Sequence, residues 1–104
     1  MKKFKALYKA MHDDLKDSEM MIEYACDIRE KHEEDKALAD ELAKYAQYRL
    51  NHFMEFHKLF QIESKKMPAI TQETVSMCMW KETHEMMVEW YESIKAKIER
   101  YNNK

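Results

Sequence analysis

The sequence predicts an all-α protein folded as an antiparallel three-helix bundle. Its 104 residues include no glycine and one proline, so the residues that hairpin turns and β-bulges require are scarce. Apolar residues recur at spacings of three and four along three long stretches, and alternating β-branched runs are missing. We expect a single domain over residues 1–104, with helices at about 3–32, 35–66 and 72–101.

The first expected helix carries an apolar stripe on one side. The stripe contains Phe4, Tyr8, Met11, Leu15, Ser18, Ile22, Cys26 and Arg29. Asp13, Asp14 and Asp17 favour caps and turns, so a short helix to about Met11 with a restart near Asp13 is an alternative.

The same helix is also apolar on a second side, where Met20, Tyr24 and Ile28 point away from the stripe. A helix that is apolar on two sides either lies centrally in its bundle or contributes to an interface. We expect Met20, Tyr24 and Ile28 to form an interaction surface, and three helices with surplus apolar surface favour completion of the bundle by a homodimer.

A turn is expected within residues 29–36 (REKHEEDK), which include no apolar side chain. One unbroken helix would place the next apolar stripe about 130° out of phase with the first. The phase jump favours a turn, with Asp35 as the N-cap of the second helix. One continuous helix is the alternative.

The second expected helix has a wide apolar arc made of four columns at a spacing of seven. They are Leu38, Tyr45, His52 and Leu59; Leu42, Arg49, Phe56 and Glu63; Ala39, Ala46, Phe53 and Phe60; and Ala43, Leu50, His57 and Ser64. Arg49 lies near the middle of the arc, where a charge is costly unless it is paired. If the hairpin turns near Glu33 and Glu34, Arg49 is level with Glu19, so we predict an Arg49–Glu19 ion pair that sets the register.

Pro68 ends the second helix, and Thr71 is the expected N-cap of the third. The apolar arc of the third helix contains Met79, Trp80, Thr83, Met87, Trp90, Tyr91, Ile94, Ile98 and Tyr101. His57 and His84 lie at the edges of their arcs, where hydrogen-bonded rim histidines are expected. The ten methionines serve either as core filler or as an adaptable binding surface.

The segments SEMMIEYACDI and ALADELAKYAQYRLNHF together resemble the first helical hairpin of ferritin-like, rubrerythrin-type proteins. In that family the second helix carries A-x-x-E-x-x-H, whose Glu and His bind one iron of a di-metal centre. Ala46 and His52 match this motif, but Arg49 replaces the bridging Glu. The resemblance implies a metal site of Glu19, Glu23 and His52, with help from Glu82 or Glu85, as the alternative function.

Composition excludes several functional classes. The net charge of −2 leaves no basic footprint for nucleic acid. No apolar run is long enough for a membrane span, and the N-terminus lacks the features of a signal peptide. Cys26 and Cys78 lack metal-ligand spacing, so we expect reduced thiols and a cytoplasmic location. No nucleophile motif or glycine-rich phosphate loop is present, so we expect no enzymatic activity and no cofactor.

The leading functional prediction is a non-enzymatic interaction protein. It binds a protein partner, or a second copy of itself as a homo-oligomer, through helix faces rich in Met and aromatic residues. Small glycine-free helical proteins of this kind resemble accessory or inhibitor proteins of phages and mobile elements.

Overall fold

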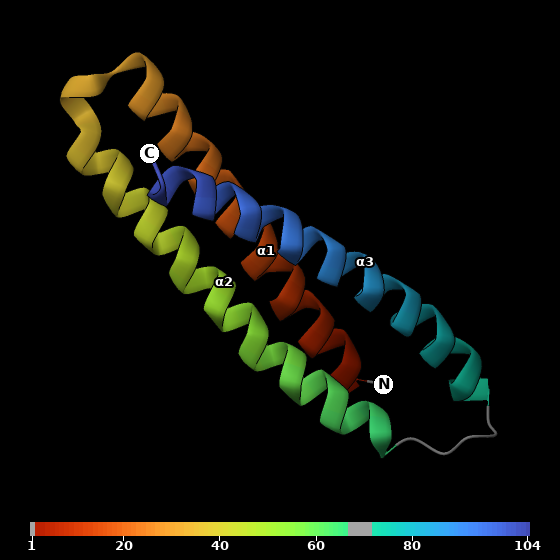
Figure 1. The fold of residues 1–104 in the computed structure, drawn as a ribbon. Helices are drawn as coiled ribbons and strands as arrows, with labels where there is room; N and C mark the ends of the chain where they lie inside the picture. Colours follow the sequence, from red (N-terminus) through yellow and green to blue (C-terminus); the bar gives the residue numbers. More distant parts are fainter. Residues whose placement is uncertain (1, 67–71) are drawn as a thin grey trace.

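The computed structural model confirms an all-α fold of three helices, shown in Figure 1. It describes the backbone of residues 2–66 and 72–104, and the side chains of residues 5–66 and 84–104. The helices are α1 (Lys2–Lys31), α2 (Lys36–Lys65) and α3 (Gln72–Asn102), with the 3₁₀ turn η1 (Glu33–Asp35) between α1 and α2. α2 runs antiparallel to both α1 and α3, and the molecule is a rod of 58 × 18 × 16 Å.

Helix α1 is continuous through its three aspartates, so a break near Asp13 is wrong. One unbroken helix from α1 into α2 is also wrong, because the chain reverses at His32 and η1. Asp35 does occupy the position before α2, but its side chain makes no capping hydrogen bond. The backbone N–H of Lys36 instead donates to the carbonyl of Glu33. The expected roles of Pro68 and Thr71 lie outside the described residues.

Small side chains bring α1 and α2 close together. Ala25 on α1 and Ala39, Ala43 and Ala46 on α2 are buried. Ser18 is fully buried between the two helices, and its hydroxyl donates a 2.7 Å hydrogen bond to the carbonyl oxygen of Ala46. A side chain this short reaches the backbone of the next helix only where the two helices approach closely, and the bond satisfies a buried polar group.

The Ser18–Ala46 hydrogen bond also gives the register of the hairpin. Position 32 lies halfway between these two residues, so the midpoint is His32, before η1. The sequence analysis placed the midpoint one to two residues later. Residues that are level in a helical hairpin have numbers that sum to twice the midpoint, so this displaces the expected partner of Arg49 by about three positions.

Larger side chains fill the space where the three helices meet. On α3 the buried residues are Met87, Ile94, Ile98 and Tyr101, while Trp90 and Tyr91 pack against them in part, as the predicted arc requires. Met79, Trp80 and Thr83 lie outside the described side chains. On α1 and α2 the largest buried side chains are Met11, Leu15, Ile22, Leu50, Phe53 and Phe60.

Arg29 and Tyr101 fasten the end of α3 to the hairpin. The guanidinium of Arg29 donates to the carbonyl oxygens of Tyr101 and Lys104, both at 2.8 Å, and lies 4.7 Å from the centre of the Tyr101 ring. The Tyr101 hydroxyl donates to Asp40 at 2.7 Å. The contacts satisfy carbonyls that a helix C-terminus otherwise leaves without partners. Burial and the hydrogen bond to Asp40 raise the pKa of Tyr101 to about 12.

Across the described ranges, no helix is both apolar enough and long enough to cross a lipid bilayer.

Substituting Ala46 with Leu tests the close approach of α1 and α2. The three additional carbon atoms of leucine cannot fit beside Ser18 without separating the helices, so we expect the free energy of unfolding to fall by about 1–3 kcal/mol. Urea denaturation followed by circular dichroism measures it. Ala96→Leu, on the exposed side of α3, is the matched control and should change little. If both substitutions lowered the free energy of unfolding equally, close packing of α1 against α2 would be contradicted.

Candidate functional site

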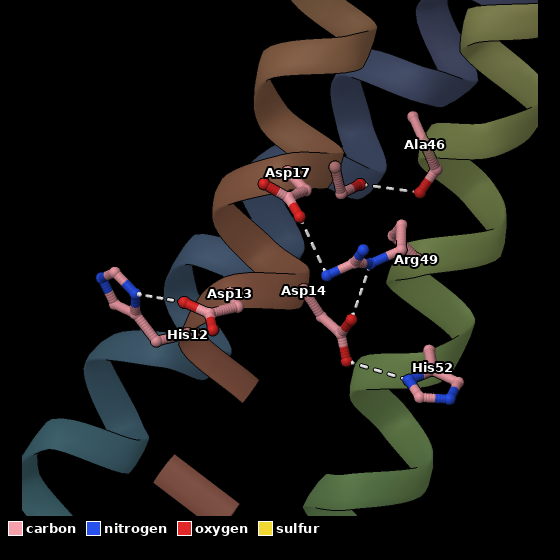
Figure 2. A network of polar contacts seen from close by, with 8 residues as sticks. His12, Asp13, Asp14, Asp17, Ala46, Arg49 and His52 are labelled. Atoms are coloured by element: carbon pink, nitrogen blue, oxygen red, sulfur yellow. Dashed lines mark hydrogen bonds and ion pairs between the residues drawn. The ribbon is translucent and has the colours of Figure 1, made fainter. Parts of the chain in front are cut away.

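A cluster of four charged or titratable side chains joins α1 to α2 midway along the hairpin (Figure 2). The Nε of Arg49 donates to Asp14 Oδ1 at 2.7 Å, and one terminal nitrogen lies 3.0 Å from Asp17 Oδ2. His52 Nδ1 lies 3.1 Å from the second oxygen of Asp14. Because a carboxylate only accepts, the Nδ1 of His52 carries the hydrogen of this bond. Asp14 therefore binds two residues of α2, one with each oxygen.

The geometry explains how a charge is tolerated on this arc. Asp14 is 3% exposed, so its carboxylate has lost nearly all its water and depends on its protein partners. Burial opposes the charge of Arg49, but the hydrogen bond that Arg49 donates to the Tyr45 hydroxyl and the charges of Asp14 and Asp17 outweigh it, so the pKa of Arg49 is raised. Arg49 therefore stays protonated.

The prediction that Arg49 pairs with a carboxylate of another helix is confirmed, but the predicted partner, Glu19, is wrong. Glu19 lies about 140° around α1 from Asp14, at 100° per residue, and faces α3. It accepts from the indole nitrogen of Trp90 at 2.9 Å and lies 3.5 Å from Lys97 Nζ.

The signal for Asp14 was present in the sequence. Asp14 lies three residues after Met11 and four before Ser18, which places it on the apolar stripe itself. Because aspartate also favours turns, Asp14 was interpreted as a possible helix breaker and not as the partner of Arg49.

The residues of the alternative metal site do not come together. Glu19 and Glu23 share the ammonium group of Lys97, which lies 3.0 Å from Glu23. His52 lies on the far side of α1 from them, bound to Asp14. Glu82 lies outside the described side chains. Among the described residues, one group of three potential ligands is close enough to hold an ion, and it is the exposed set of His32, Glu34 and Asp35. Exposed acidic groups often lie this close together without binding an ion, so this set alone does not indicate a metal site.

The hairpin has one side covered by α3 and one side uncovered. On α1, Glu19 contacts α3, and Asp17 and Tyr24 lie about 160° and 140° around the helix from it. On α2, Asp40 contacts α3, and Tyr45 lies about 140° away. Figure 2 views the network from this uncovered side, with the ribbon of α3 behind α1 and α2.

We call this uncovered side the open face. Its members are Asp13, Asp17, Met20 and Tyr24 on α1, and Leu38, Tyr45, Arg49, His52 and Leu59 on α2. The five large apolar side chains among them are between 41% and 56% exposed.

Two expectations from the sequence concern this surface. Met20 and Tyr24 are indeed uncovered by the rest of the chain, whereas Ile28 is half-buried and packs against the core. The column of Leu38, Tyr45, His52 and Leu59 was expected to belong to the core-facing arc, but it is about half exposed. The buried side of α2 is narrower than its apolar arc, because α3 covers the hairpin from one side only.

Aromatic rings extend along the exposed side of α2. The centres of Tyr45 and Tyr48 are 5.8 Å apart, those of Tyr48 and His52 are 6.1 Å apart, and His52 meets Phe56 edge-on at 4.9 Å. This aromatic row presents large side chains with few rotatable bonds, which is typical of binding surfaces.

His57 and His84 form a second unexpected pair, between α2 and α3. Their rings stack with centres 4.4 Å apart, and Phe60 lies 4.6 Å from His84. The Nε2 atoms of both are buried without a hydrogen-bond partner among the described residues, so hydrogen-bonded rim roles are wrong. Burial lowers the pKa of His57, and burial together with the neighbouring His57 lowers the pKa of His84. Parallel rings aim their nitrogen lone pairs side by side, so this pair does not converge on a metal ion.

Comparison of the chain with protein-family models, with curated proteins and with solved structures finds no match. The ferritin-like resemblance of the first hairpin therefore stays a prediction.

Replacing Asp14 with Asn tests the ion-pair cluster. The amide keeps the shape but loses the charge and one acceptor, so Arg49 and His52 lose much of their stabilisation. We expect the free energy of unfolding near neutral pH to fall by about 2 kcal/mol, as measured by urea denaturation. Glu55→Gln removes one member of the exposed Glu55–Lys58 pair and should have little effect. A neutral result for Asp14→Asn would show that the cluster does not stabilise the hairpin.

The stacked histidines predict sensitivity to acid. A histidine with a lowered pKa in the folded chain favours folding above its ordinary pKa of 6.5, and this stabilisation is lost as the pH falls below that value. The melting temperature should therefore drop between about pH 7.5 and pH 5.5. The drop should be smaller in His84→Phe, which keeps an aromatic ring but cannot titrate. His32→Gln, at an exposed histidine, is the control and should retain the full drop. An unchanged drop in His84→Phe would exclude this pair as its source.

Proposed function

We propose that this chain is a non-enzymatic interaction protein that binds its partner through the open face of the α1–α2 hairpin. The observation that carries the proposal is the exposed column of Leu38, Tyr45, His52 and Leu59, which runs along α2 with no covering helix. Isolated exposed apolar residues are ordinary, but a continuous row beside exposed Met20 and Tyr24 marks a binding surface.

The chemistry of the open face supports the same proposal. Aromatic side chains and Met bury large areas on association, and Met adapts its shape to a partner. Asp17 and His52, which are about half exposed, and Arg49, which is 22% exposed, lie among them and supply hydrogen-bond donors and acceptors. Such groups favour a partner with complementary charges over a merely apolar one.

The shape of the molecule is also consistent with helix-to-helix recognition. A two-helix surface with apolar residues at a spacing of seven suits another helix or helical hairpin, which can place its own side chains between these rows.

We retain the cytoplasm as the expected compartment, since neither cysteine has a predicted structural role that requires oxidation.

Photo-crosslinking in cells tests this function. A photoreactive benzoylphenylalanine is placed at Tyr24 or Tyr45 on the open face, or at Lys95 on the exposed side of α3 as the matched control. We expect discrete crosslinked products from the two open-face positions, either with a second copy or with another protein, and none from Lys95. Crosslinking that is equal at all three positions, or missing from all three, would contradict binding through the open face.

A further inference from the structure

The acidic and basic side chains of the open face lie on different helices. The acidic side chains of the face, Asp13 and Asp17, belong to α1, and their side chains are about half exposed. The basic and titratable ones, Arg49 and His52, belong to α2 at the same level along the rod. At the centre of the face the exposed carboxylates therefore lie on α1 and the guanidinium lies on α2, where Arg49 also pairs with Asp14 and Asp17 of its own chain.

We propose that the open face binds the open face of a second copy of this chain, with a two-fold axis parallel to α1 and α2. This inference rests on the proposed function and specifies its partner. The axis places α1 of each copy on α2 of the other. Every contact between a residue of α1 and a residue of α2 therefore occurs twice, once in each direction across the interface.

The charges select this axis over the other face-to-face arrangement. With the axis along the rod, Asp13 and Asp17 of one copy face Arg49 and His52 of the second copy. With a two-fold axis across the rod, α1 lies on α1 and the aspartates of the two copies face each other. Like charges across an interface cost several kcal/mol, whereas opposite charges support the contact.

The apolar side chains agree with the same arrangement. Position 20 of α1 and position 45 of α2 are level in the hairpin register that the Ser18–Ala46 bond defines. Rotation about the axis along the rod therefore brings Met20 of one copy against Tyr45 of the second copy, and a thioether against an aromatic ring is a favourable contact.

The extent of the face is adequate for a dimer. At 1.5 Å per residue, the column from Leu38 to Leu59 is about 32 Å long. The rod is 58 Å long and 18 Å wide, so the column and its α1 neighbours cover more than half its length. An area of this extent is of the order of the roughly 800 Å² that each partner buries in a standard interface.

Sedimentation velocity of the purified chain over a concentration series tests the self-association. We expect a reversible monomer–dimer equilibrium. Tyr45→Glu should weaken the dimer at least about tenfold, because it buries an unpaired charge at the centre of the interface. Met86→Glu, at an exposed apolar residue of α3, should leave the equilibrium unchanged. Circular dichroism of both variants verifies that the helices are retained.

Crosslinking between isotopically distinct copies tests the axis. Chains carrying benzoylphenylalanine at Tyr24 are mixed with ¹⁵N-labelled chains, irradiated and mapped by mass spectrometry. Crosslinks from position 24 to α2 of the labelled copy support the axis along the rod, and crosslinks to α1 of the labelled copy overturn it.

The outcomes separate this inference from the proposed function. A chain that stays monomeric at every concentration, or whose dimer persists unchanged in Tyr45→Glu, overturns the proposed dimer. If the monomeric chain still crosslinks to a different protein from Tyr24 in cells, the function through the open face stands with another occupant. If neither a dimer nor crosslinked products form, both proposals fail.

Discussion

The ion pair between Asp14 and Arg49 is the interaction on which the geometry of the hairpin depends. A carboxylate that is 3% exposed has almost no water to solvate it, so it must lie against its cation in every populated arrangement of the two helices. With Asp14 and Arg49 at 2.7 Å, the helices cannot slide past each other by a turn without leaving a buried charge unpaired. Such a charge costs several kcal/mol, which is a large part of the stability of a small domain.

The row of buried alanines on α2 does not by itself determine the register of the two helices, so the ion pair is needed to select it. Ala39, Ala43 and Ala46 present similar small side chains at spacings of four and three, so a shift of one helical turn places alanine where alanine was before. Packing alone therefore distinguishes neighbouring registers weakly. Asp14 instead has its partners, Arg49 and His52, at fixed positions of α2, so the ion-pair cluster selects a single register, and the hydrogen bond from Ser18 forms in that register.

The sequence predicted the helices well and their contacts less well. The ends of all three helices fall within one residue of the predicted positions, because helical spacing and charged turns are local signals. The need of Arg49 for a carboxylate also followed from its place on the apolar arc. The identity of the carboxylate did not, because it depends on the midpoint of a turn that lacks glycine. An error of one or two residues there shifts the expected level of the partner on α1 by about three positions, away from Asp14 and toward Glu19.

The open face could not be predicted from the width of the apolar arc, since an arc does not show how many neighbours cover it. Only the assembled structure shows that α3 packs against the side of the hairpin that carries Glu19 and Asp40. The column from Leu38 to Leu59 is then the part of the apolar arc of α2 that stays about half exposed. The ion-pair cluster lies within this face, with Asp14 buried beneath it and Asp17 and His52 about half exposed. The same residues that select the register of the hairpin therefore present an ordered set of charges to whatever binds there.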